Sequence, residues 1–322
     1  MRCRFVLASF QTLSVATAAA LLAGCAGVSA VTPKPKVPQA VVHSILNDTC
    51  PAKGPIEYVS DDAEYVGVFV YAGNFAGQAS CFHITAGLHG AQGLYVQPVT
   101  HDLYVANTGN QNIQVFHRGE TVPYNTYPIR YHSVTDVTVA NDGTVIAIHG
   151  AGISTWVGGP HGGTFVGTFP LKDHPQADWV TAQGNGSIYY DFLNPTTHRG
   201  ELWTLECPAG HCHRGTQVAG VTLQYPEGME FDSKGDLLVV SRDVNQINNT
   251  LNTYELPNPS PSTLPLLPGW PTGVAISETD HHLFVVDAIN HDAVEYSYPN
   301  GQLIGTVQDN SGGYPIGVAV DN

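Results

Sequence analysis

The sequence carries little charge for its length. Only 12% of its 322 residues are Asp, Glu, Lys or Arg, about half of the roughly 25% found in typical soluble domains. Helical bundles and coiled coils need many Glu and Lys residues on their surfaces, so the composition excludes both architectures. Disorder is excluded as well, because 43% of the residues are apolar and disordered chains combine low hydrophobicity with high charge.

Basic residues are scarcer than acidic ones. Twelve Lys and Arg residues stand against 27 Asp and Glu residues, which gives a net charge of −15. Binding to a phosphate backbone needs clustered Lys and Arg side chains, so no nucleic-acid partner is expected.

The common catalytic motifs are also missing. The sequence contains no Gly-x-Ser-x-Gly nucleophile elbow, no His-Glu-x-x-His helix and no Gly-Lys-Ser/Thr phosphate loop. Turn-forming residues are plentiful instead, with 34 Gly and 22 Pro. Their spread between apolar segments favours many short strands joined by tight turns.

Long hydrophobic runs are confined to the N-terminus. Two arginines precede a mostly apolar segment, Phe5–Ala23, and Leu-Ala-Gly-Cys25 closes this region. The pattern resembles a bacterial lipobox, so residues 1–24 are expected to be a lipoprotein signal peptide and Cys25 to carry lipid. Plain secretory cleavage is an alternative, and a retained membrane helix is disfavoured by polar residues within the run.

The residues after the signal peptide divide into two parts. The segment 25–41 contains three prolines close together and is expected to form an extended tether. The remaining residues, 42–322, are expected to form one domain. The protein would then be an exported monomer, held in the cell envelope by its lipid and facing the periplasm or the cell surface.

Cysteine usage agrees with export. Four cysteines remain after the lipid-bearing one: Cys50, Cys81, Cys207 and Cys212. An even number in an exported chain predicts disulfides. Cys207 and Cys212 flank a turn-forming Pro-Ala-Gly-His insert, which favours a disulfide across one hairpin, and Cys50 would pair with Cys81. A metal site made by Cys207, Cys212 and two neighbouring histidines is the alternative.

An internal repeat runs along the chain. Turn residues, a polar residue or Gly, an apolar strand, a tight turn and a second apolar strand recur, as in VTDVTVANDGTVIAIH from Val134 and WPTGVAISETDHHLFVVD from Trp270. One position of the repeat is held by Gly93, Asp136, Asp178, Gly228, Gly273 and Gly317, at steps of 42 to 50 residues. This period is typical of four-stranded propeller blades, and the apolar alternation excludes helical repeats.

The pattern predicts that the two ends of the chain together complete one shared repeat. The last repeat, YPIGVAVDN from Tyr314, has a first strand only. Near the start of the domain, Val68–Gly73 and Cys81–Ile84 resemble the second and third strands within Leu103–Phe116. The sequence therefore predicts an all-β fold, a six-bladed β-propeller closed by pairing of the C-terminal strand with the N-terminal blade.

Two segments resemble a known repeat family. LYVANTGNQNIQVF at 103–116 and the Pro-x-Gly-Val-Ala strands at 271–275 and 315–319 look like NHL repeats. Over residues 60–322 the chain resembles the group of six-bladed propellers that includes the NHL and gluconolactonase-like proteins. The resemblance implies the fold, which serves enzymes, receptors and scaffolds alike.

Strand direction predicts where a ligand would bind. In a four-stranded meander, the loops that enter the first and third strands share one face of the ring, where the central channel opens. Starts of the first strands lie at Gln92, Asp136, Asp178, Glu227, Thr272 and Ile316, and ends of the second strands at Asn107, His149, Asp191, Ser241 and Asp287, with Ala72 in the shared blade. Two polar rings are therefore expected at the channel mouth.

Carboxylates within these rings suggest a cation site. The predicted metal ligands are Asp136, Asp178, Asp191, Glu227 and Asp287. Clusters of carboxylate oxygens suit Ca²⁺ or another divalent cation. Two alternatives stay open, namely capping of turns by Asp side chains and a site for an organic ligand.

Uncharged residues on the same face are candidates for ligand binding. They are Gln92, Asn107, His149, Trp179 and Trp270. The two tryptophans flank first strands and would stack on a sugar or an aromatic ligand if they face the channel, whereas packing between blades is the alternative.

The gluconolactonase-like proteins provide a residue-level comparison. The resemblance implies a Glu-Gly start of one first strand and an Asp at the end of one second strand, which Glu227-Gly228 and Asp287 match. The Asn-Gly starts of that group are absent here. The expected function is a binding module for a protein, a glycan or a small ligand at the channel face, with a divalent-metal-dependent hydrolase or lactonase as the alternative.

Overall fold

A computed structural model describes residues 55–62, 67–72, 80–130, 132–159, 161–174, 177–256, 260–267, 269–308 and 313–321. The chain divides into Met1–Val41 and Val42–Asn322, and the second unit contains every described strand. The expected signal peptide, the lipid-bearing Cys25, the tether and Cys50 lie outside the described residues and stay predictions. No helix within the described ranges is long and apolar enough to cross a membrane.

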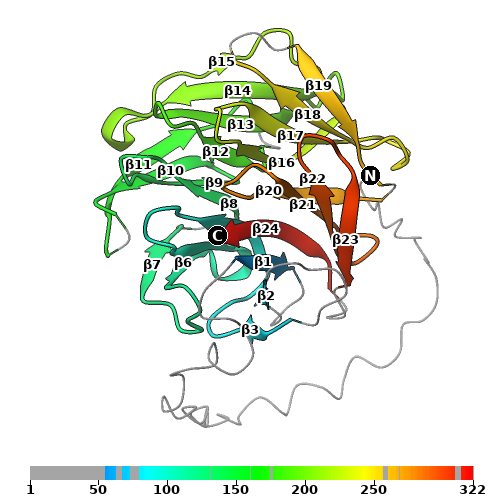
Figure 1. Cartoon of the computed structure of the whole chain (residues 1–322). Helices are drawn as coiled ribbons and strands as arrows, with labels where there is room; N and C mark the ends of the chain where they lie inside the picture. The colour runs from blue at the N-terminus through cyan, green and yellow to red at the C-terminus, as the bar shows by residue number, and fades with distance from the viewer. Residues whose placement is uncertain are drawn as a thin grey trace, which may run out of the picture. The chain divides into compact units, whose positions relative to one another are not determined.

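The strands form six antiparallel four-stranded sheets, the blades (Figure 1). Blade 1 comprises, from the inside outward, β24 (Pro315–Asp321), β1 (Ile56–Asp61), β2 (Gly67–Ala72) and β3 (Phe82–Ile84). Blade 2 comprises β4 (Ala91–Val96), β5 (Leu103–Asn107), β6 (Asn112–Phe116) and β7 (Asn125–Pro128). Blade 3 comprises β8 (Val134–Val139), β9 (Val145–His149), β10 (Gly152–Val157) and β11 (Thr164–Pro170).

The remaining blades repeat this meander. Blade 4 comprises β12 (Val180–Ala182), β13 (Ser187–Leu193), β14 (Gly200–Glu206) and β15 (Thr216–Gln217). Blade 5 comprises β16 (Tyr225–Phe231), β17 (Leu237–Arg242), β18 (Thr250–Tyr254) and β19 (Pro261–Pro265). Blade 6 comprises β20 (Pro271–Ile276), β21 (His282–Asp287), β22 (Asp292–Ser297) and β23 (Leu303–Gln308). Two short 3₁₀ turns are η1 (Thr108–Asn110) and η2 (Pro208–Gly210).

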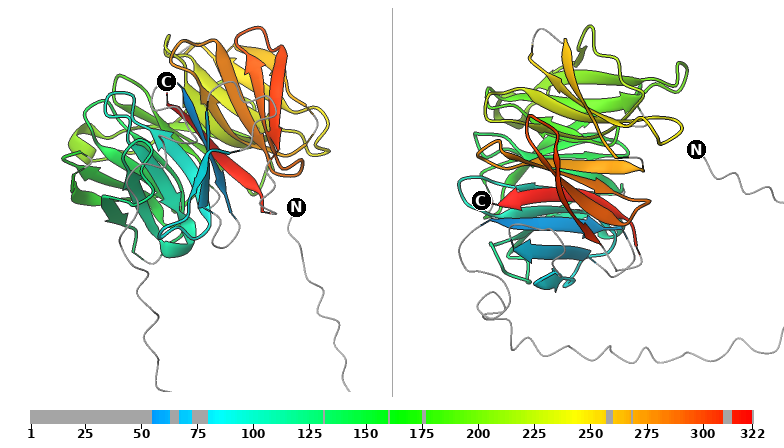
Figure 2. Two further views of the ribbon diagram at one scale, coloured as in Figure 1. Left: turned by 60° about the horizontal axis from the view of Figure 1, so that its bottom comes forward. Right: turned by 45° about the vertical axis from the view of Figure 1, so that its right-hand side comes forward.

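The innermost strands close a ring. In the order β24, β4, β8, β12, β16 and β20, each contacts the next, and β20 contacts β24 again. Figure 2 shows the blades arranged around this centre. The structure therefore confirms the predicted six-bladed β-propeller.

Ring closure occurs in blade 1, but with one more N-terminal strand than the sequence predicted. β24 pairs antiparallel with β1, with Tyr58 opposite Ala319, and in Figure 1 the red β24 lies beside the blue β1. The prediction that Val68–Gly73 forms the second strand was wrong, because β2 is third and β3 is fourth. Glu57 and Ser60 interrupt the apolar pattern of β1, although all of its residues are buried.

The hydrophobic core consists of layers between neighbouring blades. In β5, Leu103 and Val105 pack in the layer with blade 1, whereas Tyr104 and Ala106 pack in the layer with blade 3. Successive residues of a strand point to opposite faces, and both faces are covered here. Because the central strands of each blade have no solvent face, the fold needs few charged residues.

Close approach of the innermost strands explains the repeated glycines. A Cβ atom on Gly273 would lie 2.7 Å from the carbonyl oxygen of Ile316 and 3.0 Å from Cα of Gly317. At the equivalent position of blade 3, Asp136 places its carboxyl group against Gly93 of blade 2. The side chain of Asp136 is therefore accommodated because blade 2 provides a glycine beside it.

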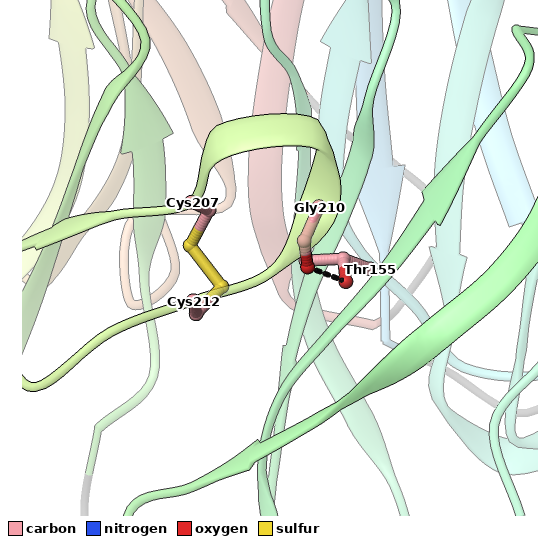
Figure 3. The surroundings of a disulfide bond; sticks show 4 residues. All are labelled: Thr155, Cys207, Gly210 and Cys212. Atoms are coloured by element: carbon pink, nitrogen blue, oxygen red, sulfur yellow. Dashed lines mark hydrogen bonds between the residues drawn. A yellow bond between two sulfur atoms is a disulfide. The ribbon is translucent and has the colours of Figure 1, made fainter.

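A disulfide loop joins two blades. Cys207 and Cys212 are linked by a disulfide around η2 (Figure 3), so neither thiol is available for the alternative metal site. The hydroxyl of Thr155 in blade 3 donates a hydrogen bond of 2.6 Å to the carbonyl oxygen of Gly210 within the loop. Cys81 is also disulfide-bonded.

Candidate ligand-binding site

A cavity of about 800 Å³ lies at the mouth of the central channel. It is surrounded by starts of first strands and by loops that follow second strands, and so lies on the face expected from strand direction. Its lining includes Asp62, Gln92, Thr135, Asp178, Trp179, Glu227, Arg242, Trp270, Thr272, Ala288, Ile289, Tyr314 and Ile316. Five of the candidate ligand-binding and metal-ligating residues line it together: Gln92, Asp178, Trp179, Glu227 and Trp270.

One ion pair forms a wall of the cavity. Nε of Arg242, at the end of β17, donates a hydrogen bond of 2.9 Å to Oε1 of Glu227 in β16. The guanidinium group lies 4.4 Å from the ring centroid of Trp270 and 5.0 Å from that of Tyr225. Arg242 is therefore held by one carboxylate and two aromatic rings, and its charge is already balanced.

The environment of Glu227 shifts its ionisation. Burial raises the pKa of Glu227 to about 7, although the Arg242 charge and hydrogen bond act in the opposite direction. The two effects oppose each other because burial disfavours the ionised carboxylate and the guanidinium group favours it.

Asp178 is the carboxylate best placed to meet a ligand. It keeps solvent-exposed surface and lines the cavity just before β12. Among the residues that the structure describes, its carboxylate accepts no hydrogen bond and forms no ion pair. Desolvation by the surrounding blades raises the pKa of Asp178.

The turn that presents Asp178 is held from behind by Asp191. Oδ1 of this buried residue in β13 accepts hydrogen bonds from the backbone N–H groups of Trp179 (2.9 Å) and Asp178 (3.2 Å). Burial, together with the neighbouring Asp178 charge, raises the pKa of Asp191 well above its ordinary value. Asp191 thus positions the cavity wall instead of lining the cavity.

Two further predicted metal ligands, Asp287 and Asp136, also accept hydrogen bonds from backbone N–H groups. Oδ1 of Asp287 accepts N–H groups from Trp270, Ile289 and Asn290, each at 3.0 Å. Asp136 lies deeper in the channel, where its Oδ2 accepts the N–H group of Val180 at 2.9 Å. Their carboxylates satisfy donors in turns and between blades, as the capping alternative predicted.

The five predicted metal ligands therefore do not converge on one point. Asp178 and Glu227 alone among them line the cavity. No group of three or more His, Cys, Asp or Glu side chains within the described ranges is arranged to hold a metal ion. Binding of Ca²⁺ or another divalent cation stays a prediction from the sequence, and the geometry of Asp136, Asp191 and Asp287 does not fit it.

Two predicted ligand-binding residues lie away from the mouth cavity. The amide of Asn107 accepts the N–H group of His89 at 2.7 Å and donates to the carbonyl oxygen of Gly87 at 2.8 Å. His149 borders a separate cavity of about 540 Å³, where Nε2 lies 2.8 Å from Oγ of Ser154.

Sequence reasoning missed two charged residues of the mouth cavity. Asp62 follows β1, the strand that the apolar pattern did not reveal, so Ala72 was assigned to a position that belongs to the end of β1. Arg242 follows Ser241, where the second strand of blade 5 was expected to end, but β17 continues for one more residue. Arg242 could have been found from the sequence, because it directly follows an apolar strand in a chain that has few basic residues.

Neither a protein-family model nor a curated protein sequence matches the chain. Similar solved structures include a nidogen/laminin complex, with a TM-score of 0.64 and 13% identity over 84% of this chain and 99% of that chain. The calcium-binding protein regucalcin from Agrobacterium tumefaciens matches with a TM-score of 0.53 and 12% identity, over 71% of this chain and 77% of that chain. A protein from Desulfotomaculum acetoxidans matches with a TM-score of 0.56 and 12% identity, over 83% of this chain and 99% of that chain. At these identities the similarity shows the fold, that of a β-propeller.

Proposed function

We propose that this protein is an exported, lipid-anchored propeller that binds a small organic ligand in the cavity at the channel mouth. The observation that carries the proposal is the cavity itself, because its volume of about 800 Å³ falls within the range of small-molecule sites. The indole ring of Trp270, one ion pair and a carboxylate without a partner among the described residues line it, a combination of apolar surface and few polar groups that is typical of such sites. Trp179 also borders the cavity, but its side chain packs between blades.

The rigidity of the walls supports a role in binding. Trp179 is only 8% exposed, and Asp191 holds its backbone. Trp270 is fixed by the N–H bond to Asp287 and by the guanidinium group of Arg242. A site that is already arranged loses less conformational entropy when a ligand binds.

Intrinsic tryptophan fluorescence of the full-length protein in detergent tests the proposal. A panel of monosaccharides, amines and organic acids should include compounds that change the fluorescence saturably, and Trp270→Ala should abolish the change. Trp203→Phe is the matched control, because Trp203 lies in β14 and outside the cavity lining. A panel without any saturable change, or an unaltered response of Trp270→Ala, would refute ligand binding in this cavity.

Export and lipid attachment require a separate experiment. Metabolic labelling with a fatty-acid analogue should label the wild-type protein in the envelope fraction and leave Cys25→Ala unlabelled. If Cys25→Ala is still labelled, the lipid is attached to another residue and the lipobox prediction is wrong.

A metal-dependent hydrolase remains the second candidate, favoured by one observation. The pKa of Glu227, at about 7, suits a group that exchanges protons near neutral pH. Lactone turnover that is sensitive to EDTA and lost in Glu227→Gln would favour the enzyme over the binding module. Turnover unaffected by both changes, or none at all across a lactone panel, would dismiss this candidate.

A protein partner at the same face is the other form that a binding module can take. The nidogen/laminin complex contains a chain whose fold is similar to this propeller. Crosslinking in the native envelope, with and without a saturating cavity ligand, distinguishes a partner that uses the channel mouth from one that binds elsewhere.

A further inference from the structure

The charges around the mouth cavity are unequal in number. Three carboxyl groups line it, from Asp62, Asp178 and Glu227, against the single guanidinium group of Arg242. Because Arg242 is already paired with Glu227, a ligand meets an excess of negative charge. An anionic ligand would have to displace Glu227 to reach the cation, whereas a cationic ligand meets carboxylates directly.

Asp178 is the direct counter-charge in this arrangement. The carboxylates of Glu227 and Asp191 are engaged with Arg242 and with backbone N–H groups, respectively. Asp62 accepts the backbone N–H group of Tyr314 at 3.2 Å. Asp178 has no such partner among the described residues, so its hydrogen-bonding capacity is directed to the cavity.

Aromatic rings accompany this carboxylate. Trp179 is its chain neighbour, and Trp270 and the half-exposed Tyr314 line the same cavity. The face of an aromatic ring attracts an ammonium group and also packs on a flat apolar ring, and both effects grow when water is excluded. A divalent ion would need several converging oxygen ligands instead, an arrangement not found in the described part of the chain.

We propose that the mouth cavity selects organic ammonium compounds, in which a protonated amine is attached to an aromatic or flat apolar ring, and that Asp178 is the counter-ion of the amine. This inference rests on the proposed function, since it names the class of ligand for the same cavity. The ring of the ligand would lie against Trp270, and the amine would lie toward β12.

Three compounds with one common frame test this selection. 2-Phenylethylamine, 2-phenylethanol and 3-phenylpropanoate present an ammonium, a hydroxyl and a carboxylate group on similar phenylalkyl chains. Calorimetry and ligand-observed NMR with the full-length protein in detergent at pH 7.5 measure their affinities. The amine should bind at least about tenfold more tightly than the alcohol, and the carboxylate should bind most weakly.

Single substitutions connect this preference to Asp178. Asp178→Asn should reduce the affinity for the amine to that for the alcohol and leave the alcohol unchanged. Glu278→Gln removes an exposed negative charge from the β20–β21 hairpin, at the far end of an innermost strand, and should preserve the preference for the amine. Circular dichroism and thermal melting check that Asp178→Asn is folded, which is expected because its carboxylate has no hydrogen-bond partner within the described part of the chain.

The outcomes separate the inference from the function on which it rests. Equal affinity for amine and alcohol, or a preference that survives in Asp178→Asn, overturns the ammonium selection while ligand binding stands. If none of the three compounds binds saturably in a manner sensitive to Trp270→Ala, the inference fails. If the panel of monosaccharides, amines and organic acids also gives no saturable change in fluorescence, the proposed function fails as well.

Discussion

Buried carboxylates join neighbouring blades, residue by residue. Asp136 of blade 3 accepts the N–H group of Val180 in blade 4, and Oε2 of Glu230 in blade 5 accepts that of Ile276 in blade 6 at 2.8 Å. Burial raises the pKa of each acid to about 8. Ionisation of either carboxyl group therefore opposes folding.

Asp136→Asn is expected to change how stability depends on pH. The folded pKa of about 8 lies above the ordinary value, so the stabilisation by Asp136 is complete below about pH 4 and is lost as the pH rises toward 8. Relative to wild type, the variant should therefore gain roughly 2–5 kcal/mol in free energy of unfolding between pH 4.5 and 8.5. Urea unfolding at both pH values measures this gain, and a constant difference would show that Asp136 does not titrate in this range.

A second prediction at this scale concerns the ion pair in the mouth cavity. Arg242 lowers the pKa of Glu227 against the effect of burial. Arg242→Met keeps an apolar chain between the two aromatic rings but removes the charge, so the pKa of Glu227 should rise above 7. NMR titration of carboxyl-labelled glutamate follows the change, and an unchanged or lowered pKa would mean that the pair is not formed in solution.

At the scale of the element, the first strand of each blade determines how closely the ring packs. The pairing of β20 with β21 shifts register between Pro271 and Val274, and an equivalent shift occurs in blades 1, 2, 3 and 5. Such bulges bend the strand and increase its twist. They lie where the repeat holds Gly or Asp, so the repeated position reflects backbone contact between blades.

Gly273→Ala should destabilise the protein strongly. The new Cβ atom would meet backbone atoms of β24, which belong to another blade and cannot rotate away. We expect a loss of about 2–3 kcal/mol in the free energy of unfolding, measured with urea. Gly167→Ala in the outer strand β11 is the matched control, because no atom lies within 4 Å of its Cβ position, and it should be neutral. Equal effects of both substitutions would contradict the close approach.

At the scale of the whole molecule, closure depends on the last described residues. β24 is hydrogen-bonded to β1 within blade 1. At the end of β24, Asp321 contacts two residues that follow strands of blade 2. The Asp321 carboxylate is 1% exposed, forms an ion pair with Arg118 and lies 2.6 Å from Nδ1 of His101. The final strand thus joins two blades as well as completing one.

Asp321→Asn should weaken this closure. The amide keeps the shape of the side chain but loses the negative charge opposite Arg118, which is only 21% exposed. A decrease of about 2 kcal/mol in the free energy of unfolding is expected, with earlier proteolysis near the C-terminus. Glu278→Gln, which removes an exposed charge, should leave both measurements unchanged. Wild-type stability of Asp321→Asn would assign closure to the strand pairing alone.

The number of blades and the face of the cavity were predictable because both follow from local patterns. The repeat at Gly228, Gly273 and Gly317 reports the blade period, and strand direction determines which loops share a face. The role of each carboxylate was not predictable, since the repeat pattern places both Asp178 and Asp191 at the channel mouth without showing which one faces the cavity. Asp191 faces two backbone N–H groups, whereas Asp178 faces the cavity.

The sequence by itself thus determined the all-β repeat, the closure at the termini and the scarcity of charge, because alternation and turn residues act over a few positions. Only the tertiary structure decided that β1 is the second strand of blade 1, which brings Asp62 to the mouth cavity. It also paired Arg242 with Glu227 and left the Asp178 carboxylate without a partner among the residues that the structure describes. These outcomes depend on contacts between distant segments, where burial and the supply of hydrogen-bond donors, not residue type, determine what a carboxylate does.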